Sequence, residues 1–132
     1  MEIVITEWAL QSYLDLKGRN VFTREEYWSV IRPDVELLRD GFPSPHEKFQ
    51  NSKFWGPATS KGIVLQYGHK MKWHQVGSGH MQLRLAVALF SDAFLCRAYV
   101  KRDDKVDQRE VARFKIHIRN ITLGSYRMRG ML

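Results

Sequence analysis

The sequence predicts one α+β domain over residues 1–132, with an N-terminal strand and two helices, a four-stranded antiparallel meander and a C-terminal helix. Three changes of pattern predict it. Apolar residues repeat every three or four positions up to about residue 40, alternate from residue 62 to 101, and return to helical spacing after residue 107. A chain of 132 residues with 44% hydrophobic and 12% aromatic content suits a single folded core.

The first elements are a short strand and an amphipathic helix. Residues 2–5 contain three β-branched side chains, which favour a strand. Thr6 is a suitable N-cap for the helix that follows, because its hydroxyl can accept from a backbone amide of the first turn. Apolar residues from Ala9 to Leu14 have helical spacing, and Gly18 marks the end of this helix.

A second helix is expected to begin at Thr23. The Thr23 hydroxyl and the Glu26 carboxylate, three residues later, have the spacing of a capping box. Pro33 should kink this helix and Gly41 should end it, so that two antiparallel helices pack together. Residues 42–60 contain several Pro, Gly and Ser residues and are expected to form an irregular connection. The aromatic residues expected to attach this connection to the core are Phe49, Phe54 and Trp55.

The period of two then predicts the meander. Its strands are expected at residues 63–67, 69–75, 81–90 and 93–101. Gly77 to Gly79 and the pair Ser91 and Asp92 lie where the hairpin turns are needed. The third strand has one apolar face, because every odd position from Met81 to Leu89 is large and apolar.

The last element is predicted as a capped basic helix. Asp107 and Glu110 have capping-box spacing, and Gly124 is expected to end the helix. The apolar stripe of this helix consists of Val111, Phe114, Ile118 and Ile121. Residues 125–132 are predicted to be a loose, basic tail.

The charge of the chain indicates a polyanionic partner. The sequence has 21 Lys and Arg against 14 Asp and Glu residues, a net charge of +7, which attracts phosphates through the summed field and through counterion release. No apolar run is long enough to cross a bilayer, which predicts a cytoplasmic protein without a membrane partner. The single cysteine, Cys96, is expected to be a small buried residue. The five histidines show no metal-ligand spacing, so neither a metal nor a cofactor is expected.

The outer face of the third and fourth strands is the candidate site. If Ser91 and Asp92 form a two-residue turn, the expected partners are Phe90 with Ala93, Ala88 with Leu95, Ala86 with Arg97, and Arg84 with Tyr99. The two alanines would leave a hollow in the sheet surface, with cationic and phenolic side chains around it. The same alternation places Lys70, Lys72 and His74 on this face. The predicted basic cleft consists of Lys70, Lys72, His74, Arg84, Arg97, Tyr99 and Lys101.

Such a cleft could cleave RNA without a metal. The reaction needs a base for the 2′-hydroxyl, positive charge near the phosphorane and an acid for the leaving 5′-oxygen. His74 is the natural titrating group, because imidazole has an ordinary pKa near neutrality. The candidate catalytic residues are His74, Arg84, Arg97, Tyr99 and Lys101. The competing interpretation is a solvated outer face whose basic residues serve only solubility.

Two segments resemble a known toxin family. The run FLCRAYVKRD at residues 94–103, followed by DQREVARFKIHIRN from residue 107, resembles the closing strand and C-terminal helix of the RelE/HigB toxin superfamily. The run LRLAVALF, with Arg84, is similar to the family strand that carries a central arginine. The resemblance covers roughly the last fifty residues. It implies a β-α-α-β-β-β-α arrangement, a RelE-like fold.

The resemblance also implies a function. It implies a metal-independent endoribonuclease of a bacterial toxin–antitoxin pair, which cleaves mRNA on the ribosome and is neutralised by a small antitoxin protein. The residues that match the motif positions are Arg84, Arg97, Lys101 and Arg102, and the family often places further basic residues where Lys70, Lys72 and His74 lie. The residues expected to contact RNA are Lys70, Lys72, Arg102 and Arg113. Two alternatives stay open: a ParE-like toxin that inhibits gyrase or another protein, and a nucleic-acid-binding domain without catalysis.

Overall fold

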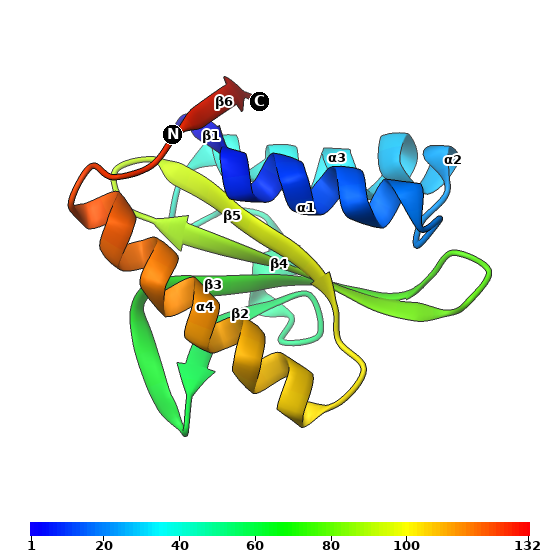
Figure 1. The fold of residues 1–132 in the computed structure, drawn as a ribbon. Coiled ribbons are helices and arrows are strands. Elements are labelled where there is room, and N and C mark those ends of the chain that lie inside the picture. Colours follow the sequence, from blue (N-terminus) through cyan, green and yellow to red (C-terminus); the bar gives the residue numbers. More distant parts are fainter.

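A computed structural model describes residues 1–132 and shows a six-stranded sheet with helices on both faces (Figure 1). The strands are β1 (Ile3–Thr6), β2 (Trp55–Ser60), β3 (Ile63–Val76), β4 (Met81–Leu89), β5 (Ala93–Val100) and β6 (Met128–Met131). The α-helices are α1 (Glu7–Gly18), α2 (Arg24–Glu26), α3 (Arg32–Glu36) and α4 (Asp104–Thr122). The π-helical turn is η1 (Tyr27–Ile31), and the 3-10 turns are η2 (Leu37–Asp40) and η3 (Glu47–Gln50).

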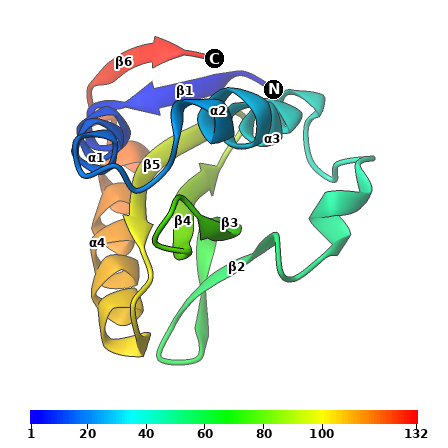
Figure 2. The same ribbon diagram turned by 90° about the vertical axis from the view of Figure 1, so that its right-hand side faces the viewer.

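The α+β class is confirmed, but the sheet is mixed instead of wholly antiparallel. Its strand order is β2-β3-β4-β5-β1-β6. β1 pairs with β5 in parallel, whereas all other neighbours are antiparallel. Figure 2 shows β6 beside β1, so that both ends of the chain lie at one edge of the sheet. None of the helices is both long and apolar enough to cross a membrane.

The predicted division into strands was wrong in three places. The segments expected at 63–67 and 69–75 form one strand, β3. β2 lies in the connection expected to be irregular, and β6 lies in the tail expected to be loose. Gly68 explains the first error, because a Cβ there would lie 3.2 Å from both Ile118 and Phe114. This glycine permits the close approach of α4 to β3 and does not mark a turn.

The helix caps of the N-terminal part are as predicted. The Thr6 hydroxyl accepts from the amide of Ala9 at 3.2 Å. In the capping box, the Thr23 hydroxyl accepts from the Glu26 amide at 3.0 Å and the Glu26 carboxylate accepts from the Thr23 amide at 2.7 Å. Helical structure continues through Pro33, because the preceding π turn lets the amide of Arg32 reach the carbonyl of Tyr27.

Glu26 also attaches the β3–β4 hairpin to the second helical segment. Its carboxylate accepts from the amide of Gly77 at 2.9 and 3.0 Å. Gly77 has a φ of +70°, and a Cβ there would lie 2.2 Å from the carbonyl oxygen of Val21. Only glycine fits this turn without displacing the neighbouring backbone.

Two hydrophobic cores lie on opposite faces of the sheet. The first contains the odd-numbered β4 residues Leu83, Leu85 and Val87 under α1 and α3, as the alternation predicted. The second contains Ala86 and Ala88 under α4. The stripe of α4 that packs there is the predicted one: Val111, Phe114, Ile118 and Ile121. The buried Cys96, also predicted, belongs to this second core.

The start of α4 differs from the prediction. Its N-cap is Asp103, whose carboxylate accepts from the amide of Val106 at 2.8 Å. Asp107 and Glu110 therefore do not form a capping box. Both carboxylates turn toward basic residues of the sheet instead.

His117 of α4 is buried beneath the helix. Its ring stacks on Trp8 with centroids 4.0 Å apart. Burial lowers the pKa of His117 to about 4, with a further lowering by the guanidinium groups of Arg97 and Arg113. The imidazole is therefore neutral in the folded protein at physiological pH.

We expect the packing of α4 on the sheet to be sensitive to volume at Ala88. Ala88→Leu should lower the free energy of unfolding by about 1–3 kcal/mol, because the fully buried methyl group faces α4. Urea denaturation at neutral pH measures the loss. Ala112→Leu, on the exposed side of the same helix, is the matched control and should change stability by about 0.5 kcal/mol or less. Equal effects of the two substitutions would contradict the burial of Ala88.

His117 should make stability depend on pH. Between its ordinary pKa of 6.5 and its lowered pKa of about 4, the unfolded chain binds a proton that the folded protein does not. The free energy of unfolding should therefore fall as the pH drops through this window, by up to about 3 kcal/mol. Denaturation of His117→Phe, which keeps an aromatic ring on Trp8, should show a smaller fall than wild type. His80→Asn, an exposed control, should behave as wild type.

Candidate functional site

The strand register brings basic side chains into two rows on one face of the sheet. Lys72 of β3 pairs with Arg84 of β4, which pairs with Tyr99 of β5. Lys70 pairs with Ala86, which pairs with Arg97. Residues directly opposite one another share a face. The predicted partners Ala86 with Arg97 and Arg84 with Tyr99 are thus confirmed.

The partners expected nearer the turn were wrong. Ala88 pairs with Phe94 instead of Leu95, and Ala93 pairs with Leu89 instead of Phe90. A register shift between Ala86 and Val87 moves the ladder by one residue. The connection between β4 and β5 consequently has three residues, 90–92, and not two.

The hollow predicted between the alanines is filled. Ala86 and Ala88 are 3% and 0% exposed beneath α4. Small residues in the middle of a strand allow a helix to pack closely. The prediction that these two alanines leave an open depression was therefore wrong. Arg84 and Tyr99 are also buried, at 5% and 6% exposure.

Four cations gather beside the first turns of α4, two of them partly exposed and two largely buried. We call Lys70, Lys72, Arg84 and Lys101 the basic cluster. The Lys72 Nζ donates to the carbonyl of Ser52 at 2.9 Å, and the Arg84 guanidinium donates to the Gln82 side chain at 2.8 Å. Lys101 is partly exposed, 3.7 Å from the exposed carboxylate of Asp104. Neither Lys72 nor Arg84 has a carboxylate partner within 4.0 Å.

Asp107 is the buried anion of the site. Its carboxylate accepts from the Tyr99 hydroxyl at 2.6 Å and from the Lys70 Nζ at 3.1 Å. Burial acts to raise the pKa of Asp107, but the hydrogen bonds from Tyr99 and Lys70 outweigh it and leave this pKa lowered. Burial, and then the Asp107 carboxylate, raise the pKa of Tyr99. Tyr99 therefore stays protonated and positions Asp107.

Lys72 is the lysine of the basic cluster whose pKa is lowered. Burial lowers its pKa first, and the positive charges of Lys70, Arg84 and Lys101 lower it further, against a smaller opposing effect of Asp107. Its ammonium loses a proton more easily than that of an ordinary lysine. A half-buried amine of this kind can exchange protons. The neighbouring cations can at the same time bind a negatively charged group.

His74, the titrating group expected from the sequence, lies two residues beyond Lys72 on β3. It is exposed, and its Nε2 lies 2.7 Å from the carbonyl oxygen of Lys53. Nε2 donates this bond. The basic cluster lies on the preceding part of β3, and the backbone leaves the regular ladder at Gln75, where φ is +58°.

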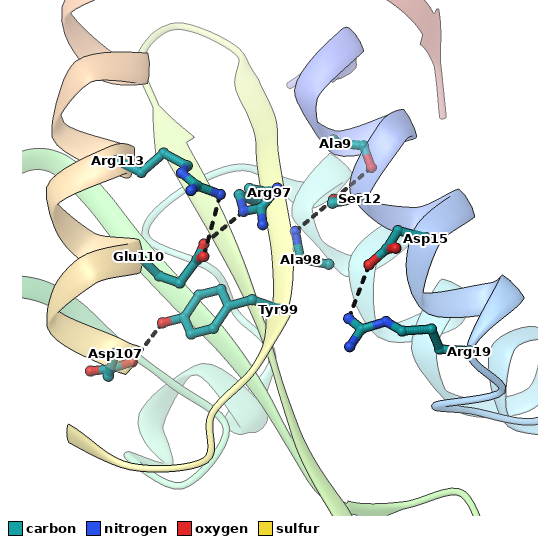
Figure 3. A network of polar contacts seen from close by, with 10 residues as sticks. All are labelled: Ala9, Ser12, Asp15, Arg19, Arg97, Ala98, Tyr99, Asp107, Glu110 and Arg113. Carbon is teal, nitrogen blue, oxygen red and sulfur yellow. Dashed lines mark hydrogen bonds and ion pairs between the residues drawn. The ribbon is translucent and has the colours of Figure 1, made fainter. Parts of the chain in front are cut away.

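The remaining predicted residues belong to a second basic region. Arg97 donates to Glu110 at 2.7 Å, and Arg113 contacts the same carboxylate at 3.5 Å (Figure 3). These two arginines and Arg102 line a cleft between α1 and α4. The sequence-predicted site is therefore divided into the basic cluster on one side of Tyr99 and this arginine-lined cleft on the other.

The acidic residues of α4 were missed as site residues. Asp104, Asp107 and Glu110 repeat every third position, contacting Lys101, Lys70 and Arg97 in turn. The signal was present in the sequence, because an acidic stripe on an otherwise basic helix complements a basic sheet face. No group of three or more His, Cys, Asp or Glu side chains that could hold a metal ion comes together.

Comparison with known proteins finds no match: no protein-family model, no curated protein and no solved structure is similar to the chain at a significant level.

Asp107 should be the main electrostatic support of the site. Asp107→Asn should lower the free energy of unfolding at pH 7 by roughly 1–3 kcal/mol, because Lys70 loses its buried counter-charge. The stabilisation by the carboxylate is present above its ordinary pKa of 3.8 and is lost as the pH falls through the lowered folded value. Denaturation of wild type and variant from pH 7 to 2 should therefore converge in acid. Asp104→Asn, at an exposed carboxylate, is the matched control; an equal loss there would contradict the assignment.

Proposed function

We propose that the protein is a metal-independent endoribonuclease of the toxin type that cleaves mRNA at the basic cluster. One observation carries the proposal: Lys70 and Lys72 of β3, Arg84 of β4 and Lys101, which follows β5, lie close together, with Asp107 as the buried carboxylate among them. Holding like charges together costs free energy. A phosphate group bound among them would relieve this repulsion.

The cluster contains groups for each part of the reaction. Neutral Lys72 accepts the proton of the 2′-hydroxyl as that oxygen attacks phosphorus, and the ammonium of the partly exposed Lys101 donates a proton to the 5′-oxygen as its bond to phosphorus breaks. Arg84, held by Gln82, and Lys101 supply positive charge to the phosphorane. Lys70 contributes less free charge, because Asp107 neutralises it. We assign the titrating role to Lys72 in place of His74.

The resemblance to the RelE/HigB toxins supports the substrate and the partner. Lys70, Lys72, Arg84 and Lys101 occupy positions where those toxins carry basic residues, and these four come together from β3, β4 and the residue after β5. The proposed substrate is accordingly mRNA on the ribosome. The proposed inhibitor is a small antitoxin protein.

Lys72 gives the most direct test, because its side chain is partly exposed and makes only one hydrogen bond, to the Ser52 carbonyl. Induced expression of wild type in bacteria should arrest growth and produce cut mRNA, and the purified protein, stripped of metal with EDTA and then freed of the chelator, should cleave mRNA on ribosomes. Lys72→Ala should reduce the cleavage rate about a hundredfold or more. Lys72→Arg should do so as well, since guanidinium keeps the charge but does not titrate.

Lys115→Ala, at an exposed lysine of α4, is the control of equal charge change and should cleave as wild type. Arg84→Ala is a poorer test, because this arginine is buried and its loss would affect folding. Growth arrest with intact mRNA and DNA damage signalling would favour gyrase inhibition. Tight, salt-dependent RNA binding without cleavage products would favour a non-catalytic binding domain.

A further inference from the structure

A second basic concavity lies at the free edge of β5. It has a volume of about 260 Å³ and is bounded by α1 on one side and α4 on the other (Figure 3). β1 pairs with β5 only as far as Leu95, so the edge from Arg97 to Val100 faces this space. Its arginines, which define the arginine cleft, are Arg19, Arg97, Arg102, Arg109 and Arg113.

The arginine cleft carries excess positive charge. Its five arginines face two carboxylates, Asp15 and Glu110. Glu110 is shared between Arg97 and Arg113, and Asp15 contacts Arg19 at 3.0 Å. Arg102 and Arg109 make no ion pair.

The floor of the cleft is built by buried hydrogen bonds. The Ser12 hydroxyl donates to the carbonyl of Ala9 at 2.8 Å and accepts from the amide of Ala98 at 2.9 Å. This hydroxyl ties α1 to the edge of β5. The fold therefore sets the distance between the arginines at the end of α1 and those of α4. Guanidinium groups bind phosphate oxygens through paired hydrogen bonds, so this arrangement suits a phosphate ligand.

We propose that the arginine cleft binds a phosphodiester of the RNA chain that is cut at the basic cluster. The inference rests on the proposed function and extends its substrate site. Tyr99 joins the two regions, since it pairs with Arg84 of the basic cluster and also lines the arginine cleft. On the surface the regions meet at the partly exposed Lys101 of the basic cluster and the exposed Arg102 of the arginine cleft. A single strand that follows these two residues meets positive charge in both regions, and one phosphate bound in each region sets its direction.

The test separates binding from cleavage. An RNA of about ten nucleotides with 2′-O-methyl groups cannot be cut, and its affinity is measured by fluorescence anisotropy over a range of salt concentrations. Arg19→Ala/Arg109→Ala should weaken its binding about tenfold. The slope of the logarithm of the binding constant against the logarithm of the salt concentration should become less steep by about 0.7 per lost phosphate contact. Lys115→Ala/Arg119→Ala removes the same charge from exposed positions of α4 outside the cleft and should have a much smaller effect.

The outcomes distinguish this inference from the proposed function. Equal losses of affinity in the cleft variant and in the control variant would overturn the arginine cleft as a phosphate site. In a further outcome, adenosine monophosphate alone binds as tightly as the 2′-O-methyl RNA, and the cleft variant abolishes that binding. In that case the ligand is a free nucleotide and the RNA assignment is overturned. If the cleft variant loses RNA affinity while wild type cuts no RNA, the cleft is supported and the ribonuclease proposal fails.

Discussion

The structure depends on the way α4 packs against a basic sheet face. Three small residues, Gly68, Ala86 and Ala88, allow the helix to approach closely. Close approach would bury Lys70 and Tyr99 without partners, at a substantial cost in free energy. Asp107 removes that cost by accepting hydrogen bonds from both. Apolar contact holds the middle of the helix, and this carboxylate holds the end next to the cations.

The same contact divides the positive charge of the molecule. Asp107 and Glu110 neutralise the cations nearest the helix, namely Lys70 and Arg97. Lys72 and Arg84 stay on one side of this acidic stripe without carboxylate partners. The arginine cleft lies on the other side. Tyr99 borders both regions, and the proposal that one RNA strand contacts both is based on this arrangement.

Local patterns were sufficient to predict several parts of the fold and site. The caps at Thr6 and Thr23 depend on groups within three residues and formed as expected. Alternation in β4 placed Leu85 and Arg84 on opposite faces, and the row from Arg84 to Tyr99 followed from it. Residue patterns that fit two different structures were assigned wrongly. Gly68 resembles a turn residue in sequence, although the structure uses it for contact with α4.

The sequence by itself determined the α+β class, most of the helix ends and which basic side chains share a face, because these follow from spacing along one chain. Only the tertiary structure decided what covers that face. The position of α4 arises from contacts between residues such as Ala88 and Phe114, which are far apart in the chain and whose meeting no local period encodes. The packing of α4 filled the expected hollow and left the arginine cleft beside β5, while burial and the neighbouring cations lowered the pKa of Lys72.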